Sequence, residues 1–273
     1  MGVRRAVELA CAQAEHGGVF TLGPLIHNPQ VLDELKRLGV KMLDEANLPE
    51  NLHGVSVIIR AHGVSPQTEI ELRQRGATVI DATCPKVKTS QLKAASFANA
   101  GYRLFLAGEE THAEIVGIRS YAETAFYAVA DNAEKAKECA VKLFAENPNA
   151  KAALIGQTTI SAEEYQAVGE AIMRFFPNLE IAQTICSATK ERQDGLRELL
   201  GKVEAVVIAG GKESANTRRL QAIAERAGKP CALVETKEDI PPAFFNLHVI
   251  GLAAGASTPD AVIDAVEQKL LSA

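Results

Sequence analysis

Two short segments place a cysteine among small polar residues. Residues 77–85 read ATVIDATCP, and residues 182–189 read AQTICSAT. Val79 and Ile80 suit a buried strand, and Pro85 cannot extend a strand ladder, so Cys84 is expected on a strand-to-helix turn. In open parallel sheets, ligands bind at the carboxyl ends of the strands. A lone cysteine is most often a small core residue, but two such segments favour metal binding or catalysis for Cys84 and Cys186.

Polar side chains follow several other predicted strands. Three of the six histidines, His27, His62 and His112, stand directly after strands, although a single loop histidine is usually a surface or structural residue. Ser214, Asn216 and Ser257 lie at predicted helix starts, where orphan N–H groups and a partial positive charge favour anions. Each serine alone is most often a plain N-cap. Taken together, the six residues predict one convergent anion site.

The segments that would carry these side chains alternate between strand and helix. Short apolar runs such as 55–60 and 205–209 predict strands, and runs such as 86–100 and 132–146 predict helices. This alternation predicts an α/β protein with parallel sheets in three small domains. We place the domains at residues 1–84, 85–185 and 186–273. The first carries the histidine loops and Cys84, the second the HAE and QTT loops, and the third Cys186 and the Ser/Asn loops.

Composition excludes several classes of protein. The chain has 273 residues, enough for two or three modest domains, and 34 acidic against 29 basic residues, a net charge of −5. That balance argues against nucleic acid as the main partner. No apolar run approaches the ~20 residues of a membrane span, and no secretory signal opens the chain. The five cysteines are odd in number and dispersed, so a disulfide framework is not expected. We expect a cytoplasmic protein without a membrane partner.

An ordered set of motifs resembles the 4-hydroxy-3-methylbut-2-enyl diphosphate reductase family (IspH/LytB). The motifs are IHNP at 26–29, AHGVS at 61–65, DATCP at 81–85, HAE at 112–114, QTT at 157–159, TIC at 184–186, SANT at 214–217 and AGASTPD at 254–260. The resemblance covers essentially the whole chain. No single motif is decisive, but their order is specific.

The resemblance implies three α/β domains in a pseudo-threefold arrangement around a central [4Fe–4S] cluster, which three cysteines hold. It implies two-electron reductive dehydroxylation of 4-hydroxy-3-methylbut-2-enyl diphosphate to isopentenyl and dimethylallyl diphosphate, the last step of the non-mevalonate isoprenoid pathway. A ferredoxin or flavodoxin supplies the electrons. By motif position, the cluster ligands are Cys84 and Cys186, the diphosphate binders are His27, His62, His112, Ser214, Asn216 and Ser257, the proton source is Glu114, and the hydroxyl that orients the substrate alcohol is Thr158 or Thr159.

General chemistry agrees with these roles. Thiolates are the usual ligands of iron–sulfur clusters. A diphosphate needs several donors, which imidazoles, hydroxyls, an amide and helix N-termini supply. Glu114 lies two residues after His112, so both side chains could reach one pocket from a single turn. The negative charge of a neighbouring diphosphate would raise the pKa of a carboxylic acid, which suits proton delivery.

The chain departs from the family in two places. The family begins with a strand and a Gly-Phe-Cys segment directly before the helix that opens this chain, so the first cluster cysteine is missing. Cys11 does not replace it, because ten helical residues at ~1.5 Å each separate it from Met1. We expect a truncated sequence that holds a cluster weakly, whereas a form with the upstream cysteine binds about four irons. Ala215 stands where the family often has a second serine. The loss of that hydroxyl is expected to weaken diphosphate binding by ~1 kcal/mol.

Two other interpretations stay open. Cys84, His112 and Glu114 could form the nucleophile, base and acid of a cysteine hydrolase, although this leaves Cys186 and the other histidines without a role. Alternatively, the chain is a cluster-deficient diphosphate-binding relative or a truncated inactive form. Colour and sulfide analysis after anaerobic purification separates a reductase from a hydrolase. Diphosphate binding without turnover would favour the cluster-deficient relative.

Overall fold

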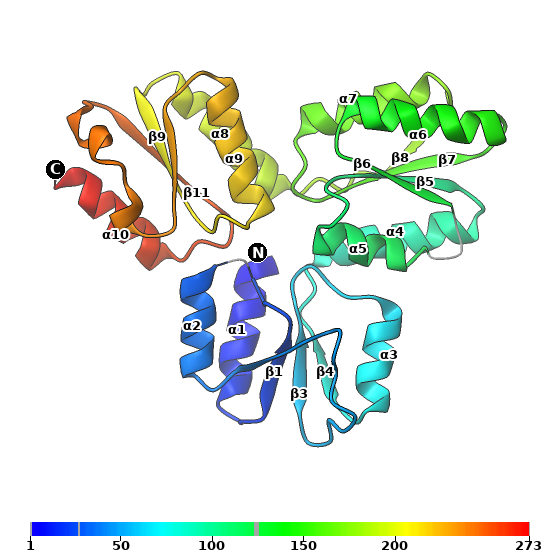
Figure 1. The fold of residues 1–273 in the computed structure, drawn as a ribbon, viewed down its shortest axis with the longest axis horizontal. Coiled ribbons are helices and arrows are strands. Elements are labelled where there is room, and N and C mark those ends of the chain that lie inside the picture. The colour runs from blue at the N-terminus through cyan, green and yellow to red at the C-terminus, as the bar shows by residue number, and fades with distance from the viewer. Residues whose placement is uncertain (1, 27, 123–125, 273) are drawn as a thin grey trace. The chain divides into compact units, whose positions relative to one another are not determined.

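The computed structural model describes residues 2–26, 28–122 and 126–272, and it contains three parallel sheets (Figure 1). The first sheet has the order β2 (Lys41–Leu43), β1 (Val19–Leu22), β3 (Ser56–Ile59), β4 (Thr78–Asp81). The second has the order β6 (Tyr127–Ala130), β5 (Arg103–Ala107), β7 (Ala152–Gly156), β8 (Glu180–Ile181). The third has the order β10 (Cys231–Val234), β9 (Ala205–Ala209), β11 (Ile250–Ala254). All ladders between these strands are parallel, so the expected α/β class is confirmed.

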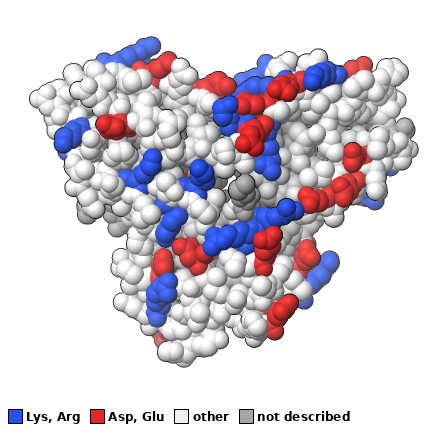
Figure 2. Space-filling model, turned by 180° about the vertical axis from the view of Figure 1, so that it is seen from behind, with Lys and Arg blue, Asp and Glu red and all other residues white. Residues whose placement is uncertain are grey.

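Helices lie in most of the connections between the parallel strands, although β2 leads to β3 without one. Among the described residues they are α1 (Gly2–Ala14), α2 (Pro29–Arg37), α3 (Pro66–Gln74), α4 (Pro85–Asn99), α5 (Ala113–Ser120), α6 (Ala133–Glu146), α7 (Ala162–Met173), α8 (Ser187–Leu200), α9 (Ala215–Arg226) and α10 (Asp260–Leu271), with 3-10 helices at Lys237–Asp239 and Pro242–Asn246. None of the helices in the described part of the chain is long and apolar enough to cross a membrane. The face in Figure 2 intersperses acidic and basic side chains.

The second sheet shows why its strands are apolar on both faces. Leu104 and Leu106 of β5 pack into one cluster with Ile115 of α5, while Phe105 packs into another with Leu143 of α6. Figure 1 shows α4 and α5 on one side of this sheet and α6 and α7 on the other. A sheet that is covered on both faces needs apolar residues at every strand position, not at alternate ones. Each buried Leu or Phe stabilises the fold by roughly 1.5–3 kcal/mol relative to exposure.

The chain divides into two compact units. One comprises Met1–Leu25 and Leu38–Cys186, and the other comprises Ile26–Arg37 and Ser187–Ala273. Helix α2 belongs to the second unit although it links β1 to β2, and Gln30 Nε2 donates to the carbonyl of Glu235 at 3.0 Å. The three sheets are observed, while the domain boundaries at 84/85 and 185/186 stay predictions.

Candidate active site

The same winding order repeats in the three sheets and places the candidate side chains. In each sheet the first strand lies between the second and the third. In the two four-stranded sheets, the connections therefore leave the first and third strands in opposite directions. The carboxyl ends of such neighbouring strands form the usual ligand crevice of open α/β sheets. In the first unit, His62 follows β3, His112 follows β5 and Thr158 follows β7. In the second unit, Ser214 and Asn216 follow β9.

Cys84 occupies the N-cap position of α4, with φ −57° and ψ 131°. Its backbone N–H donates to the carbonyl of Ala61 at 2.9 Å, which ties the cysteine turn to the turn that carries His62. Gly2 of α1 packs directly against the thiol, because a Cβ at Gly2 would lie 2.6 Å from Sγ of Cys84. The lack of a side chain at position 2 therefore leaves room for the thiol.

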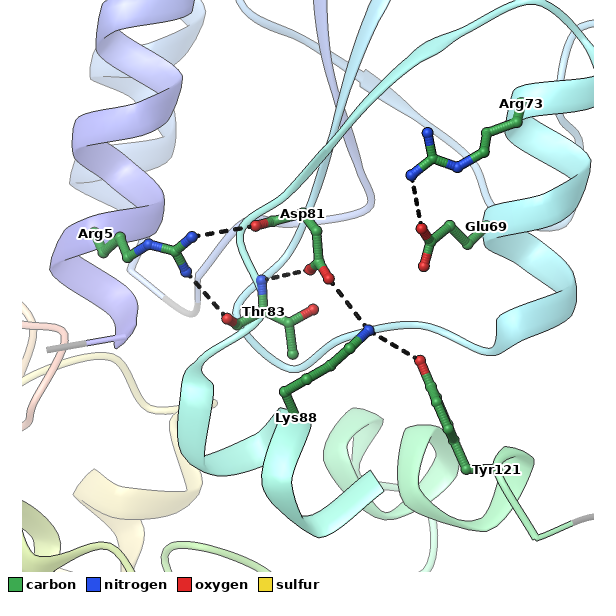
Figure 3. A network of polar contacts seen from close by, with 7 residues as sticks. All are labelled: Arg5, Glu69, Arg73, Asp81, Thr83, Lys88 and Tyr121. Atoms are coloured by element: carbon green, nitrogen blue, oxygen red, sulfur yellow. Dashed lines mark hydrogen bonds and ion pairs between the residues drawn. The ribbon is translucent and has the colours of Figure 1, made fainter. Parts of the chain in front are cut away.

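A polar network holds the turn before Cys84 (Figure 3). Arg5 of α1 donates to the carbonyls of Thr83 at 3.2 Å and Asp81 at 3.4 Å. One carboxylate oxygen of Asp81 accepts from the N–H of Thr83 at 2.9 Å, and the other accepts from Lys88 at 3.2 Å. Lys88 also donates to the hydroxyl of Tyr121, the C-cap of α5, at 3.2 Å. The network therefore connects the cysteine turn to α1, α4 and α5.

The network also shifts the pKa values of its charged members. Partial burial acts to raise the pKa of Asp81, but the hydrogen bonds from Thr83 and the charge of Lys88 outweigh burial and leave it below its usual value. Burial acts to lower the pKa of Lys88, but the hydrogen bond with Tyr121 and the charge of Asp81 leave it above its usual value. Both shifts favour the ion pair, which keeps the turn in one conformation.

His112 is the N-cap of α5, and its imidazole replaces the usual Ser or Asp at that position. The ring Nδ1 accepts a hydrogen bond from the N–H of Glu114 at 3.1 Å. A neutral imidazole that accepts at Nδ1 carries its proton at Nε2. The ring of His62 meets His112 edge-on, with centroids 5.3 Å apart. The helix start thus sets the tautomer of His112 and places two imidazoles side by side.

Glu114 is a buried carboxylate, 2% exposed, in the first turn of α5. One of its oxygens accepts from the N–H of Thr158 at 2.6 Å, and the other accepts from the Thr158 hydroxyl at 2.9 Å. The carbonyl of Thr158 accepts from the N–H of Cys186 at 2.9 Å. The hydroxyl and the carboxylate therefore form one buried hydrogen-bonded pair, and the backbone of Cys186 lies next to it.

These contacts form an unbroken run from one cysteine to the other. The N–H of Cys84 donates to Ala61, next to His62, and the ring of His62 contacts the ring of His112. His112 accepts from the N–H of Glu114. Thr158 donates its hydroxyl to Glu114 and accepts at its carbonyl from the N–H of Cys186. All of these residues lie in the first unit. Across the described residues, no group of three or more His, Cys, Asp or Glu side chains is arranged to hold a metal ion.

The second unit contains the helix start that carries Ser214 and Asn216. Ser214 caps α9 by accepting from the N–H of Thr217 at 3.4 Å. Gly210 follows β9 and Gly255 follows β11, and a Cβ at either glycine would lie within 2.8 Å of the Thr217 hydroxyl. The two glycines therefore let α9 approach the ends of both strands. Gly210 also has φ +154°, which side-chain-bearing residues rarely adopt.

Asn216 lies in the first turn of α9 and is 5% exposed. Neither its amide nitrogen nor its amide oxygen has a hydrogen-bond partner. Leaving such a buried polar group unsatisfied costs about 1–3 kcal/mol. An amide retained there, beside the free N–H groups of a helix N-terminus, is suited to a bound anion.

Comparisons with known proteins identify the family. The family model described as LytB protein matches residues 1–271. The chain is 42% identical over 278 residues to 4-hydroxy-3-methylbut-2-enyl diphosphate reductase of Treponema denticola, and the match covers 99% of this chain and 95% of that protein. It is 41% identical to the reductase of Desulfovibrio desulfuricans, with 98% and 90% covered. The chain belongs to the LytB family.

Solved structures agree with the LytB assignment. A structure described as (E)-4-hydroxy-3-methyl-but-2-enyl diphosphate reductase, the terminal enzyme of the non-mevalonate pathway, matches with a TM-score of 0.71 and 34% identity, covering 100% of this chain and 95% of that one. The reductase of Plasmodium falciparum matches with a TM-score of 0.88, covering 98% and 83%. At 24% identity, the second match supports the fold alone. The resemblance seen in the ordered motifs is confirmed.

Two expected site residues of this LytB chain stand apart from the rest. His27 lies outside the described residues. Ser257 was expected at a helix start, but α10 begins at Asp260 and its N-cap is Pro259. The turn before the helix explains the difference, because Thr258 donates its N–H to Gly255 at 3.1 Å and its hydroxyl to Ala209 at 2.9 Å. Ser257 therefore belongs to the turn and not to the helix cap.

Sequence reasoning missed several residues that support the site. Arg5, Asp81 and Lys88 hold the turn of Cys84, yet charged residues near a strand end usually mark only a solvated surface. The DATCP segment contained a signal for one of them, because Asp two residues before a turn amide often accepts its hydrogen bond. The buried amide of Gln91 was also missed, because the packing of other segments buries it. Gln157 was named as part of the QTT motif, but its burial was not expected.

The hydrolase interpretation does not fit this geometry. A nucleophile–base–acid set needs one imidazole nitrogen as the base and the other as a donor to the acid. The Nδ1 atom of His112 already accepts from the backbone at 3.1 Å, so only Nε2 remains for both tasks. The oxygens of Glu114 accept from Thr158. The arrangement instead suits anion binding next to a buried carboxylate–hydroxyl pair.

Proposed function

We propose that this chain is a 4-hydroxy-3-methylbut-2-enyl diphosphate reductase. The observation that carries the proposal is the run of contacts from the backbone of Cys84 to the backbone of Cys186, which passes through two imidazoles and a buried carboxylate–hydroxyl pair. Relatives that are 41–42% identical over nearly their full length bear this name. The reaction is R–OH + 2 e⁻ + 2 H⁺ → R–H + H₂O, so the protein must bind an anion, supply protons and accept electrons.

The diphosphate is assigned to the imidazoles and to the start of α9. With Nδ1 occupied, His112 presents its proton at Nε2 as a donor. Asn216 supplies a buried amide, and Ser214 supplies a hydroxyl at the same helix start. The proposed set of binders is His27, His62, His112, Ser214, Asn216 and Ser257. Donors of this kind are the usual partners of phosphate oxygens.

Glu114 and Thr158 are assigned to the substrate alcohol and its protons. The Thr158 hydroxyl donates to Glu114 at 2.9 Å, so its oxygen is free to accept from the substrate hydroxyl. When Glu114 is protonated the bond reverses, and Thr158 turns its own proton toward the substrate. The hydroxyl that leaves as water and the carbon that is protonated would each receive a proton from this pair. Thr159, the next residue, is the alternative hydroxyl.

Cys84 and Cys186 are the proposed ligands of a [4Fe–4S] cluster. Thiolates are the soft ligands that such clusters require, and the backbones of both cysteines are hydrogen-bonded to turns that carry the proposed site residues. No third ligand joins them among the residues that the structure describes, so the set is incomplete and no step is derived through the cluster. When bound, a cluster supplies electrons and Lewis acidity at iron. A ferredoxin or flavodoxin is the proposed donor, and the cytoplasm, which keeps cysteines reduced, is the proposed compartment.

Anaerobic turnover tests the proposal. The purified chain, reconstituted with iron and sulfide, is supplied with 4-hydroxy-3-methylbut-2-enyl diphosphate and dithionite with a viologen mediator. We expect isopentenyl and dimethylallyl diphosphate as products, detected by mass spectrometry. Substrate binding by calorimetry without either product would instead indicate a cluster-deficient diphosphate-binding relative. Release of inorganic diphosphate without reduction would indicate a hydrolase.

A further inference from the structure

Thr184 belongs to the TIC motif, but the proposed reaction gives it no role. The strand before it, β8, has only two residues, and its ladder with β7 ends there. The N–H of Ala182, just after the strand, still donates to the carbonyl of Leu154 at 2.9 Å. Beyond that bond, other contacts must hold the segment that leads to Cys186 at the end of β7.

Two side chains replace the next bond of this ladder. In an unbroken parallel ladder of the same register, the N–H of Gly156 would donate to the carbonyl of Ala182. Instead, the N–H of Gly156 donates to the Thr184 hydroxyl at 2.9 Å. The carbonyl of Ala182 accepts from the Tyr165 hydroxyl at 2.7 Å. Thr184 and Tyr165 thus satisfy both halves of the lost backbone bond.

Tyr165 reaches this point from α7, and it is buried. Its ring lies against the bare Cα of Gly156, where a Cβ would lie 2.7 Å from the ring carbon Cε2. Its hydroxyl is also 3.0 Å from the carbonyl of Leu154, so it lies between β7 and the segment that follows β8. Burial raises the pKa of this hydroxyl well above its usual value, although Thr184 and Gly156 act to lower it, so the hydroxyl stays protonated and can donate.

The two hydroxyl contacts lie next to residues of the proposed site. Gly156 lies two residues before Thr158, whose hydroxyl donates to Glu114 at 2.9 Å. Thr184 lies two residues before Cys186, whose N–H donates to the carbonyl of Thr158 at 2.9 Å. The bond from Gly156 to Thr184 therefore closes a small ring of contacts that contains both Thr158 and Cys186. A closed ring of this size limits the movement of the two residues relative to each other.

We propose that Thr184 and Tyr165 are positioning residues that hold the Cys186 turn against the end of β7 and so fix Cys186 relative to Thr158. Because side-chain hydroxyls make these bonds, the chain can leave the ladder after β8 and still keep Cys186 next to Thr158. The consequence for turnover rests on the proposed reductase function, whereas the consequences for the backbone and thiol of Cys186 do not.

Three variants test the two contacts. Thr184→Val keeps the shape of the side chain but removes the acceptor of the Gly156 N–H, whereas Thr184→Ser keeps the hydroxyl. Tyr165→Phe keeps the ring against Gly156 and removes the donor. Ser90→Ala is the matched control, because Ser90 is also buried in the first unit, but its hydroxyl donates within α4 to the carbonyl of Lys86 at 3.2 Å.

Amide hydrogen exchange and thiol alkylation, both measured on the chain without iron, separate positioning from general loss of packing. For Thr184→Val we expect the amide of Cys186 to exchange about tenfold faster. Its thiol should react with iodoacetamide about threefold faster, as measured by mass spectrometry. Cys139 of the same unit is the internal reference, and its alkylation rate should not change. Tyr165→Phe should act in the same direction, while Thr184→Ser and Ser90→Ala should behave like the wild type.

Turnover provides a further readout on the reconstituted protein. Thr184→Val should lower kcat about fivefold, because the reacting groups are less well oriented. KM should change less than about twofold, because the proposed diphosphate binders lie on other turns. An unchanged kcat in this variant would contradict the role in turnover.

Several results would overturn the inference. Unchanged exchange and alkylation at Cys186 in Thr184→Val, or in a folded Tyr165→Phe, would show that the hydroxyls do not hold the turn. An equal rise in alkylation at Cys139 would show a general loss of packing. Faster exchange in Thr184→Ser, equal to that in Thr184→Val, would show that the hydroxyl is not what matters. Failure of the wild-type chain to turn over substrate would count against the proposed function alone, because exchange and alkylation are measured without reduction.

Discussion

The Glu114–Thr158 pair makes the sharpest prediction about a single contact. Glu114→Gln keeps an oxygen for the Thr158 N–H but removes the titrating acid, so we expect kcat to fall at least 100-fold, within the range of about 10²–10⁴ for lost general acid catalysis. Thr158→Val loses only the hydroxyl bond, so stability should fall by about 1 kcal/mol, the usual net value of one hydrogen bond. Single-turnover kinetics and urea unfolding measure the two effects.

The neighbouring hydroxyl provides the control for this pair. Thr159→Val leaves both hydrogen bonds between Glu114 and Thr158 intact. If Thr159→Val reduces the rate more than Thr158→Val does, the orienting role belongs to Thr159. If Glu114→Gln keeps its rate, the protons come from another group.

Asn216 makes a second prediction, because its amide is buried without a partner. Hydrogen bonds to charged groups contribute about 1.5–3 kcal/mol, so Asn216→Leu should raise the Kd for the substrate roughly 10- to 100-fold. The free energy of unfolding without substrate should be unchanged or higher, since an unsatisfied group is removed. Calorimetry and urea unfolding check both parts. Gln221→Ala, on an exposed part of α9, should affect neither, and a parallel loss of stability and affinity in Asn216→Leu would indicate a packing role.

The positions of the candidate side chains could be predicted because strand ends can be read from apolar runs and small polar residues. Cys84 and His112 are examples, and the structure places each at the start of a helix after a strand. The tautomer of His112 could not be predicted, because histidine is not a usual N-cap. The buried amide of Gln91 could not be predicted either, because Gly63 and Gly117, which enclose it, come from other segments.

The turn between β4 and α4 makes a prediction about pH. The folded protein holds the pKa of Asp81 below its usual value, through Thr83 and Lys88 acting against burial. Such a group adds stability above its unfolded pKa of about 4, and this stability is lost as the pH falls through the lower folded pKa. Urea unfolding between pH 6 and pH 3 should therefore show a steeper loss for the wild type than for Asp81→Asn.

Comparison with a single variant isolates this effect from the other acids. Asp44 and Asp239 also have lowered pKa values, owing to hydrogen bonds, but they are present in both proteins. Lys190→Met is the matched control, because it breaks the exposed ion pair with Asp194 at 2.6 Å. Introduced into both proteins, it should leave the difference in pH-dependent stability between the wild type and Asp81→Asn unchanged. Parallel curves for the wild type and Asp81→Asn would show that the network contributes no pH-dependent stability.

Helices and strands were predictable where their own residues determine them. Ser65 and Ser161 are the N-caps of α3 and α7, a position that serine favours, and Ser161 forms a full capping box with Glu164. The assignment of α2 to the second unit was not predictable, because successive segments usually pack next to each other. A hydrogen bond such as that from Gln30 to Glu235 joins residues about 200 positions apart and leaves no local pattern.

The repeated winding explains how unlike sequences bring similar chemistry together. In all three sheets the first strand lies between the second and third, and polar side chains follow the first and third strands. His62 and Thr158 follow the third strands of two sheets, while His112 and Ser214 follow first strands. The topology therefore supplies equivalent positions at strand ends, and each sheet fills them with a different donor. In the first two sheets a cysteine and then a helix follow the fourth strand: Cys84 and α4 come after β4, and Cys186 and α8 come after β8.

The cysteines make the last prediction, which concerns the cofactor of the whole protein. A thiol must lose its proton to bind iron, and burial raises the pKa of Cys231 to about 11, with a further contribution from Glu225. Burial also raises the pKa of Cys139. We therefore expect Cys84→Ser and Cys186→Ser to lose most of the iron and sulfide found after anaerobic reconstitution. Cys139→Ser and Cys231→Ser should keep both, with the same visible absorption as the wild type.

Iron and sulfide analysis and circular dichroism on each variant separate a lost ligand from a lost fold. Cys84→Ser and Cys186→Ser should keep the circular dichroism of the wild type without cluster, because the backbone bonds at Cys84 to Ala61 and at Cys186 to Thr158 do not need sulfur. Unchanged iron in both variants would remove the assignment of these thiols. Loss of iron from Cys139→Ser or Cys231→Ser with intact folding would place the cluster elsewhere. The residues that lie between Cys84 and Cys186 in the run of contacts would then serve anion binding alone.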